Sequence, residues 1–180
     1  MSPAQSPAQS PAQSPAQSPA GAEEARWLDE SQQQSWRALM MGITLLLDRL
    51  DADLRRSFDI SLAEYEILVR LSERPHRQLR MAQLADAMAH SRSRVTHTVK
   101  RMENAGLVER AEAAEDGRGV VCAMTEQGQQ LLERMAPTHV NGVRDYLVDL
   151  VSCDDFEALG RVMNSVADKL VVTHPESEIR

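Results

Sequence analysis

Apolar and polar positions in the first part of the chain alternate with the period of an amphipathic helix. Residues 22–58 contain no proline and one glycine. Their apolar side chains recur at steps of three and four residues, at Trp36, Leu39, Ile43, Leu46 and Leu50. This spacing predicts one long helix over residues 22–58. Because Met40, Leu45 and Leu47 widen the apolar stripe, we expect the helix to meet both its own core and a second copy of the chain.

Shorter helices are predicted next. The capping-box sequence from Ser61 to Glu64 starts a helix that ends before Pro75. A basic turn over residues 76–80, with a very short strand near Leu79, leads to a small helix whose inward side chains are Met81, Leu84, Ala85 and Met88. Ser91 then opens another short helix, so residues 81–104 are predicted to form two helices joined by a tight turn.

A β-hairpin and two more helices complete the predicted order. Residues 107–110 and 120–124 are typical of short strands around a polar loop that contains glycine. Thr125 starts a helix whose apolar pattern continues to Leu150 with a bend near Pro137, and the last helix follows residues 152–155. The order is four helices, two strands and two helices.

Composition agrees with a mainly α protein, since aromatic residues make up only 3% of the chain. The predicted fold is a winged helix-turn-helix with a helical dimerisation layer built from the N- and C-terminal helices. We expect a disordered Ser-Pro-Ala-Gln repeat tail over 1–22, an N-terminal dimerisation helix over 23–60, the winged helix-turn-helix over 61–124, C-terminal dimerisation helices over 125–172 and a flexible C-terminus over 173–180.

Charge is distributed unevenly. The net charge of -7 opposes binding to nucleic acid, but residues 74–118 carry nine basic and six acidic residues, a local balance of +3 against -10 elsewhere. The chain has no apolar run of 18 residues and no export signal, which predicts a soluble cytoplasmic protein with no membrane partner. Two distant cysteines, Cys122 and Cys153, predict neither a disulfide nor a metal site, and no cofactor is expected.

The second short helix is the predicted DNA-recognition element. If Val95, Val99 and Met102 form its buried stripe, a helical wheel points a basic and polar set of side chains to the opposite side. Ser91 and Arg92 at its start suit a phosphate. One turn further on, Arg94 and His97 suit base edges, and Thr96 suits a thymine methyl group or a phosphate. The outward set comprises Ser93, Arg94, His97, Lys100 and Arg101.

The hairpin loop holds a second candidate DNA contact. Glycines on both sides of Arg118 allow a sharp turn, and Asp116 stands two residues before it. Arg118 then enters the minor groove while Asp116 orients it. A solvated helix face and a plain hairpin turn are the alternatives for these two elements, and their succession along the chain favours DNA. Arg110 completes the predicted DNA-binding set.

These motifs resemble the multiple antibiotic resistance regulator (MarR) family. The similarity lies in residues 93–96, in residues 101–110 with the sequence RMENAGLVER, in residues 116–118, and in residues 124–128, where Met124 replaces the usual leucine. The element order is similar from about residue 23 to 172. The resemblance implies an obligate homodimer that binds pseudo-palindromic promoter DNA as a repressor and releases it when a small aromatic or acidic ligand or an oxidant is sensed.

The resemblance also implies which helices form the dimer. The candidate dimerisation residues are Leu39, Ile43, Leu46, Leu50, Leu147, Phe156, Leu159 and Val166. The redox-sensing branch of the family has a cysteine near the start of the first long helix, which this chain lacks, so Cys122 and Cys153 are predicted to be structural or incidental. The ligand-binding residues stay unknown, and the candidates for an effector cavity are Trp27, Trp36, Arg37, His139 and Arg144.

An enzyme and a protein-association module are the two alternative functions. The chain has no nucleophile elbow, P-loop, zinc-protease motif or nucleotide-binding glycine pattern, so we expect no enzyme and no catalytic residues. A winged-helix module for protein association is the stronger alternative. Arg94, Lys100 and Arg118 argue against it, because a protein-binding module has no need of basic residues that face a groove.

Overall fold

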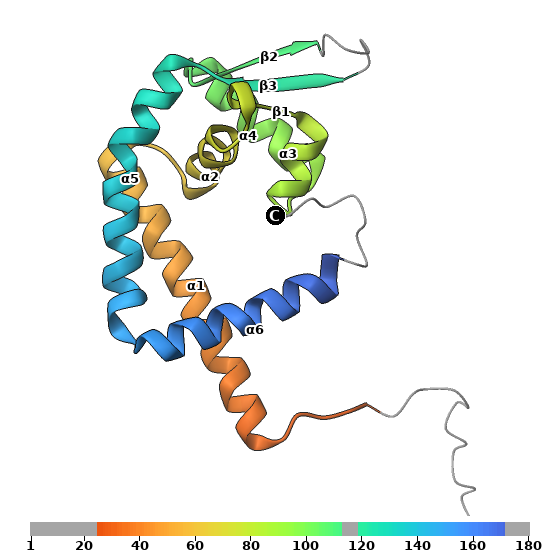
Figure 1. The fold of residues 1–180 in the computed structure, drawn as a ribbon, viewed down its shortest axis with the longest axis vertical. Coiled ribbons are helices and arrows are strands. Elements are labelled where there is room, and N and C mark those ends of the chain that lie inside the picture. The colour runs from red at the N-terminus through yellow and green to blue at the C-terminus, as the bar shows by residue number, and fades with distance from the viewer. Residues whose placement is uncertain (1–24, 113–118, 172–180) are drawn as a thin grey trace, which may run out of the picture. The chain divides into compact units, whose positions relative to one another are not determined.

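The computed structural model describes residues 25–112 and 119–171, and its contacts divide the chain into two units, residues 1–37 and 38–180. The predicted fold class is confirmed, since the described residues form helices and one small antiparallel sheet (Figure 1). The elements are α1 (Glu30–Phe58), α2 (Leu62–Ser72), β1 (Gln78–Arg80), α3 (Met81–Ala87), α4 (Arg92–Asn104), β2 (Val108–Glu112), β3 (Val120–Met124), α5 (Glu126–Tyr146) and α6 (Cys153–Val171), with single 3-10 turns at Pro75–Arg77 and Val148–Leu150. The predicted terminal regions 1–22 and 173–180 lie outside the described residues.

Helix α1 begins later than the sequence pattern predicts. Residues 25–29 are not helical, and the helix starts at Glu30 rather than at residue 22. The backbone N–H of Gln32 donates to Asp29 Oδ1 at 2.8 Å, and the backbone N–H of Asp29 donates to Gln32 Oε1 at 3.1 Å. This reciprocal capping satisfies two backbone donors and fixes the helix start.

The core of the second unit is built from one face of each of the helices α1 to α5. Leu54 of α1, Leu68 of α2, Val99 of α4 and Met135 of α5 are fully enclosed. The sheet contributes Cys122 from its central strand. Complete burial of a Leu or Val side chain stabilises a fold by about 1.5–3 kcal/mol, so these contacts fix how α4 packs against α2.

The sheet has the order β1-β3-β2, and both pairings are antiparallel (Figure 1). Leu79 lies opposite Cys122, and Val108 lies opposite Met124. The predicted very short strand near Leu79 is therefore confirmed. Because β3 lies in the middle, the hairpin of β2 and β3 is joined directly to the strand that precedes α3.

Helix α5 ends earlier than predicted. It contains Pro137 and stops at Tyr146, and Leu147 has non-helical torsion angles of φ -142° and ψ -64°. The phenolic O–H of Tyr146 donates to Asp53 of α1 at 2.7 Å, and Arg144 contacts Asp149 at 2.6 Å. The apolar spacing continues through Leu147, but these contacts replace another helical turn by the 3-10 turn.

Candidate nucleic-acid interface

A tight junction connects the end of α4 to the start of α5. Gly106 has a positive φ of 72°, and the backbone N–H of Leu107 donates to the carbonyl of Met102 at 3.0 Å, a Schellman arrangement that ends α4. Thr125 caps α5 by accepting from the Gly128 N–H at 3.0 Å, and its hydroxyl donates to the Gly106 carbonyl at 2.7 Å. The residues that the sequence motifs have in common therefore build the backbone path from helix to wing.

Helix α4 starts as predicted. Ser91 is its N-cap, and its Oγ accepts from the backbone N–H of Arg94 at 3.3 Å. The turn from α3 passes through Ala89, which has a positive φ of 49°, and the N–H of His90 donates to the carbonyl of Ala85 at 3.1 Å. Arg92 is the first helical residue and is exposed, so the helix presents its N-terminal turn at the surface.

The two faces of α4 differ as the helical wheel predicts. Val95, Val99 and Met102 are buried in the core. Thr96 is exposed, and its hydroxyl donates to the carbonyl of Arg92 at 2.8 Å, which leaves its oxygen able to accept a hydrogen bond. The exposed side chains of the opposite face include Ser93, Arg94, His97 and Lys100.

Arg101 was predicted to bind DNA, but the structure gives it a partner within the protein. Its Nε donates to Glu64 Oε1 at 2.7 Å, and its Nη2 donates to Ser61 Oγ at 3.2 Å. Glu64 is buried at 4% exposure, so the ion pair is partly shielded from solvent. The helical wheel placed Arg101 on the outward face correctly, but it gave no information about the neighbouring helix α2.

Arg110, also a predicted DNA contact, likewise has a partner within the protein. Its Nη2 lies 2.6 Å from Glu103 Oε2, and its Nε donates to the same oxygen at 3.1 Å. The hydrogen bond to Arg110 lowers the pKa of Glu103 below its ordinary value. This pair joins α4 to strand β2, so Arg110 supports the wing from inside the domain.

The wing tip lies outside the described residues. Asp116 and Arg118, both predicted to act there, fall in residues 113–118. The strands on each side are described, and their ladder extends to the pair Glu112 and Val120. The ladder therefore holds Glu112 and Val120, the strand residues nearest the loop, opposite each other.

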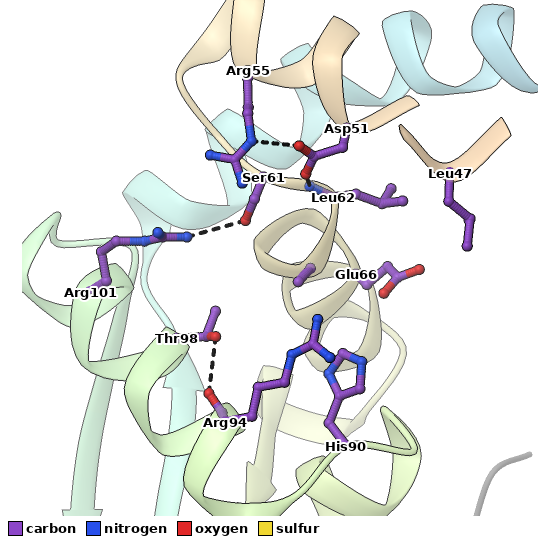
Figure 2. Close-up of a pocket in the computed structure, with 11 residues that line it drawn as sticks. Leu47, Asp51, Arg55, Ser61, Leu62, Glu66, His90, Arg94, Thr98 and Arg101 are labelled. Atoms are coloured by element: carbon purple, nitrogen blue, oxygen red, sulfur yellow. Dashed lines mark hydrogen bonds and ion pairs between the residues drawn. The ribbon is translucent and has the colours of Figure 1, made fainter. Parts of the chain in front are cut away.

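An open pocket of about 400 Å³ lies beside α4 (Figure 2). Asp51 and Leu62 line one side of it, and His90 and Arg94 line the other. Figure 2 shows the guanidinium of Arg94 next to the ring of His90, on the side of the pocket where Glu66 of α2 also lies. Burial raises the pKa of Glu66, and the charge of Arg94 opposes that shift. Burial also lowers the pKa of His90, and Arg94 adds to that effect. The sequence pattern does not predict this pocket, because its walls come from separate segments.

None of the five candidate effector residues lines this pocket. Trp27 and Trp36 are exposed, and Arg37 donates to Gln33 at 3.1 Å. The ring of His139 packs against Tyr65 with centroids 4.5 Å apart, and Arg144 pairs with Asp149. Neither His139 nor Arg144 lines the pocket beside α4.

The candidate dimerisation residues differ in exposure. Leu50 is buried at 5% exposure in the core of its own protomer, so it does not present an apolar surface to a partner. Leu46, Leu147 and Leu159 are partly buried. Those that remain exposed are Leu39, Ile43, Phe156 and Val166.

The two cysteines are both free, and they differ in burial. Cys122 is fully buried in β3, and burial raises the pKa of its thiol to about 12. Cys153 is exposed at the start of α6. Within the part of the chain that the structure describes, no group of three or more His, Cys, Asp and Glu is placed to hold a metal ion, and no helix is long and apolar enough to span a bilayer.

An α2-α3-α4 arrangement followed by a two-stranded wing defines a winged helix-turn-helix protein, with α4 as the recognition helix. Comparison with known proteins agrees. A sequence model described as the MarR family matches residues 58–119. The HTH-type transcriptional regulator PecS of Dickeya dadantii (strain 3937) is 29% identical over 140 residues, which cover 68% of this chain and 84% of PecS.

Two solved structures from Streptomyces coelicolor are similar over most of their length. Sco3205, a MarR family transcriptional regulator determined in complex with DNA, has 38% identity and a TM-score of 0.79, covering 83% of this chain and 93% of that one. AbsC, another MarR family transcriptional regulator, has 38% identity and a TM-score of 0.77, covering 81% and 98% respectively. The chain belongs to the MarR family of DNA-binding transcriptional regulators.

Proposed function

We propose that the protein is a homodimeric repressor that binds pseudo-palindromic promoter DNA. Helix α4 enters the major groove, and Arg118 of the wing enters the minor groove. The observation that carries this proposal is the division of α4 into a buried stripe and an exposed face that carries Arg94, His97 and Lys100. The structure of Sco3205 was determined in complex with DNA, which supports the same activity here.

The proposed contacts divide by chemistry. Ser91, Arg92 and Lys100 bind phosphates, which fixes the position of the helix without selecting a sequence. Arg94 and His97 face the base edges, where a bidentate arginine contact to guanine discriminates by roughly 1–3 kcal/mol. The remaining proposed contacts are Ser93, Thr96, Asp116 and Arg118.

Exposed apolar side chains support the proposed dimer. Met41 and Leu45 of α1 and Val162 and Leu170 of α6 are each more than half exposed. A chain rarely leaves so many large apolar side chains in water unless another surface covers them. The dimer predicts a particle of twice the 20.0 kDa chain mass in solution.

Release by a small molecule is the last part of the proposal. The pocket beside α4 has cationic and imidazole groups at Arg94 and His90 and an apolar wall at Leu47 and Leu62. This combination suits a small aromatic acid. Because Arg94 is also a proposed base contact, a ligand that engages it competes with DNA.

A salt titration tests DNA binding. The probe is a labelled duplex from the region upstream of the protein's own gene, and binding is followed by fluorescence anisotropy over roughly 50 to 300 mM salt. In a plot of log affinity against log salt, the slope should be about -0.9 for each phosphate that the protein neutralises. Arg118→Ala should make the slope shallower, and Arg94→Ala should relax the preference at particular base pairs. Unchanged binding in both variants would refute the assigned contacts. If the protein binds this duplex no more tightly than a scrambled one, the result favours the protein-association alternative.

A further inference from the structure

The first turn of α2 is a polar joint between three helices. Asp51 of α1 accepts from the backbone N–H of Leu62 at 2.8 Å. Ser61 and Glu64 form the capping box, in which Glu64 Oε2 accepts from the Ser61 N–H at 2.8 Å and from its hydroxyl at 2.6 Å. Arg101 of α4 then contacts both Ser61 and Glu64 (Figure 2 shows the bond to Ser61). We name this group, Asp51, Ser61, Leu62, Glu64 and Arg101, the α2 joint.

Glu64 is the buried charge at the centre of the joint. Burial on its own raises the pKa of Glu64, but hydrogen bonds from Arg101 and Ser61 outweigh that effect, so its pKa lies below the ordinary value. The carboxylate is therefore ionised in the folded protein. A buried carboxylate that loses its cation becomes an uncompensated charge, which destabilises the arrangement that encloses it.

Arg101 uses its guanidinium in a way that lysine cannot. Nε and Nη2 donate to two different acceptors, one on the N-cap residue and one on the third residue of α2. A planar guanidinium holds both bonds at a fixed angle, whereas an ammonium group acts as a single point charge. The side chain is still 55% exposed, so exposure alone does not distinguish a DNA contact from an internal one.

We propose that Arg101 is a positioning residue that fixes the orientation of the recognition helix by tying α4 to the buried Glu64 and the N-cap Ser61 of α2. It promotes DNA binding by holding Arg94 and His97 in register with the bases, and it does not neutralise a phosphate. The inference rests on the proposed function only for its effect on DNA, because the joint itself exists without DNA.

Hydrogen exchange tests the joint in the free protein. Arg101→Lys keeps the charge and loses the two-point contact, and we expect the backbone amides of residues 99–104 to exchange at least several-fold faster than in the parent protein. Lys100→Gln is the matched control, since it lies next to Arg101 on the same helix and is exposed, and it should leave those rates unchanged. Equal exchange in Arg101→Lys and the parent protein overturns the proposal whether or not the protein binds DNA.

The direction in which DNA affinity changes in a Glu64 variant gives a second test. In Glu64→Gln the glutamine still fits the third position of a capping box, so α2 keeps its start. If Arg101 contacts phosphate, this change frees it and removes a negative charge, and binding to the upstream duplex tightens. If Arg101 positions α4, binding weakens by about tenfold, equivalent to about 1.4 kcal/mol, and the slope against log salt stays at the parent value.

The remaining variants separate the possible failures. Arg101→Lys should weaken binding about as much as Glu64→Gln, and the double variant should lose no more than either single one. Lys100→Gln should reduce the salt slope by about 0.9. A tighter Glu64→Gln complex, or a reduced slope in Arg101→Gln, refutes the positioning role. A parent protein that does not prefer its upstream duplex refutes the proposed function and leaves the exchange result to decide the joint.

Discussion

Replacing Gly128 by alanine tests whether the junction between α4, the wing and α5 is as tight as the structure indicates. A Cβ atom at Gly128 would lie closer to the carbonyl oxygen of Leu107 than the 3.0 Å that real Cβ contacts respect, and it would also meet the side chain of Met124 at 3.0 Å. The carbonyl cannot move freely, because it accepts from the backbone N–H of Thr125 at 3.1 Å. The clash must therefore displace backbone and strain the cap of α5.

The size of the effect follows from these contacts. Overpacking of this kind costs about 1–3 kcal/mol, and a weakened backbone hydrogen bond adds about 1 kcal/mol. The expected loss in the free energy of unfolding is about 2–4 kcal/mol, which lowers the Tm of a chain of this length by roughly 4–16 °C. Thermal and urea denaturation followed by circular dichroism measure both quantities.

Two other glycines provide matched controls. A Cβ at Gly160 in α6 meets nothing within 4 Å, and because alanine favours helix, Gly160→Ala should be neutral or stabilising by up to about 1 kcal/mol. A Cβ at Gly142 lies 2.9 Å from the tip of the Leu50 side chain, which can adjust, so Gly142→Ala should fall between the two. A Gly128→Ala protein within about 0.5 kcal/mol of the parent would refute the reasoning about this junction.

Two further predictions concern buried groups. Cys122 is enclosed, and burial raises the pKa of its thiol to about 12. At about pH 7.5 a thiol-reactive reagent should therefore modify Cys153 and leave Cys122 unmodified until the protein unfolds. Mass spectrometry of the labelled native protein checks this, and rapid labelling of Cys122 contradicts the packing of β3. Burial lowers the pKa of His139 below its ordinary 6.5, so the folded state binds that proton less readily than the unfolded state, and stability should be full above pH 6.5 and fall as the pH drops below it. In urea titrations from roughly pH 7 to 5, His139→Gln should reduce this loss of stability. If the pH profile of stability is unchanged in the variant, His139 does not cause the loss.

The sequence predicted those helix ends that are set by residues close together along the chain. The capping box at Ser61 marked the start of α2, and Ser91 marked the start of α4. The buried stripe of α4 followed from a period of 3.6 residues, because three apolar positions on one face leave little choice of orientation. Gly106, where the chain takes a positive φ, lies just beyond the predicted end of α4 at residue 104.

Other features depend on contacts between distant segments. The ion pair of Arg101 joins residues 37 positions apart, and a helical wheel contains no information about α2. The end of α5 at Tyr146 is associated with a hydrogen bond to Asp53, 93 positions away. The start of α1 is hard to predict for a different reason: residues 22–29 contain no helix breaker, and the reciprocal cap of Asp29 and Gln32 is not one of the common capping motifs.

The central place of β3 limits how this domain can be exchanged between relatives. Its residues pair with β2 on one side and with Gln78–Arg80 on the other, and Arg80 leads directly into α3. A chimera that imports a foreign wing without its matching β1 would leave one edge of the new strand facing unsuitable side chains. A wing exchanged between relatives should therefore be transplanted together with residues 78–80, and the contacts of Arg101 with Ser61 and Glu64 require α2 from the same protein as well.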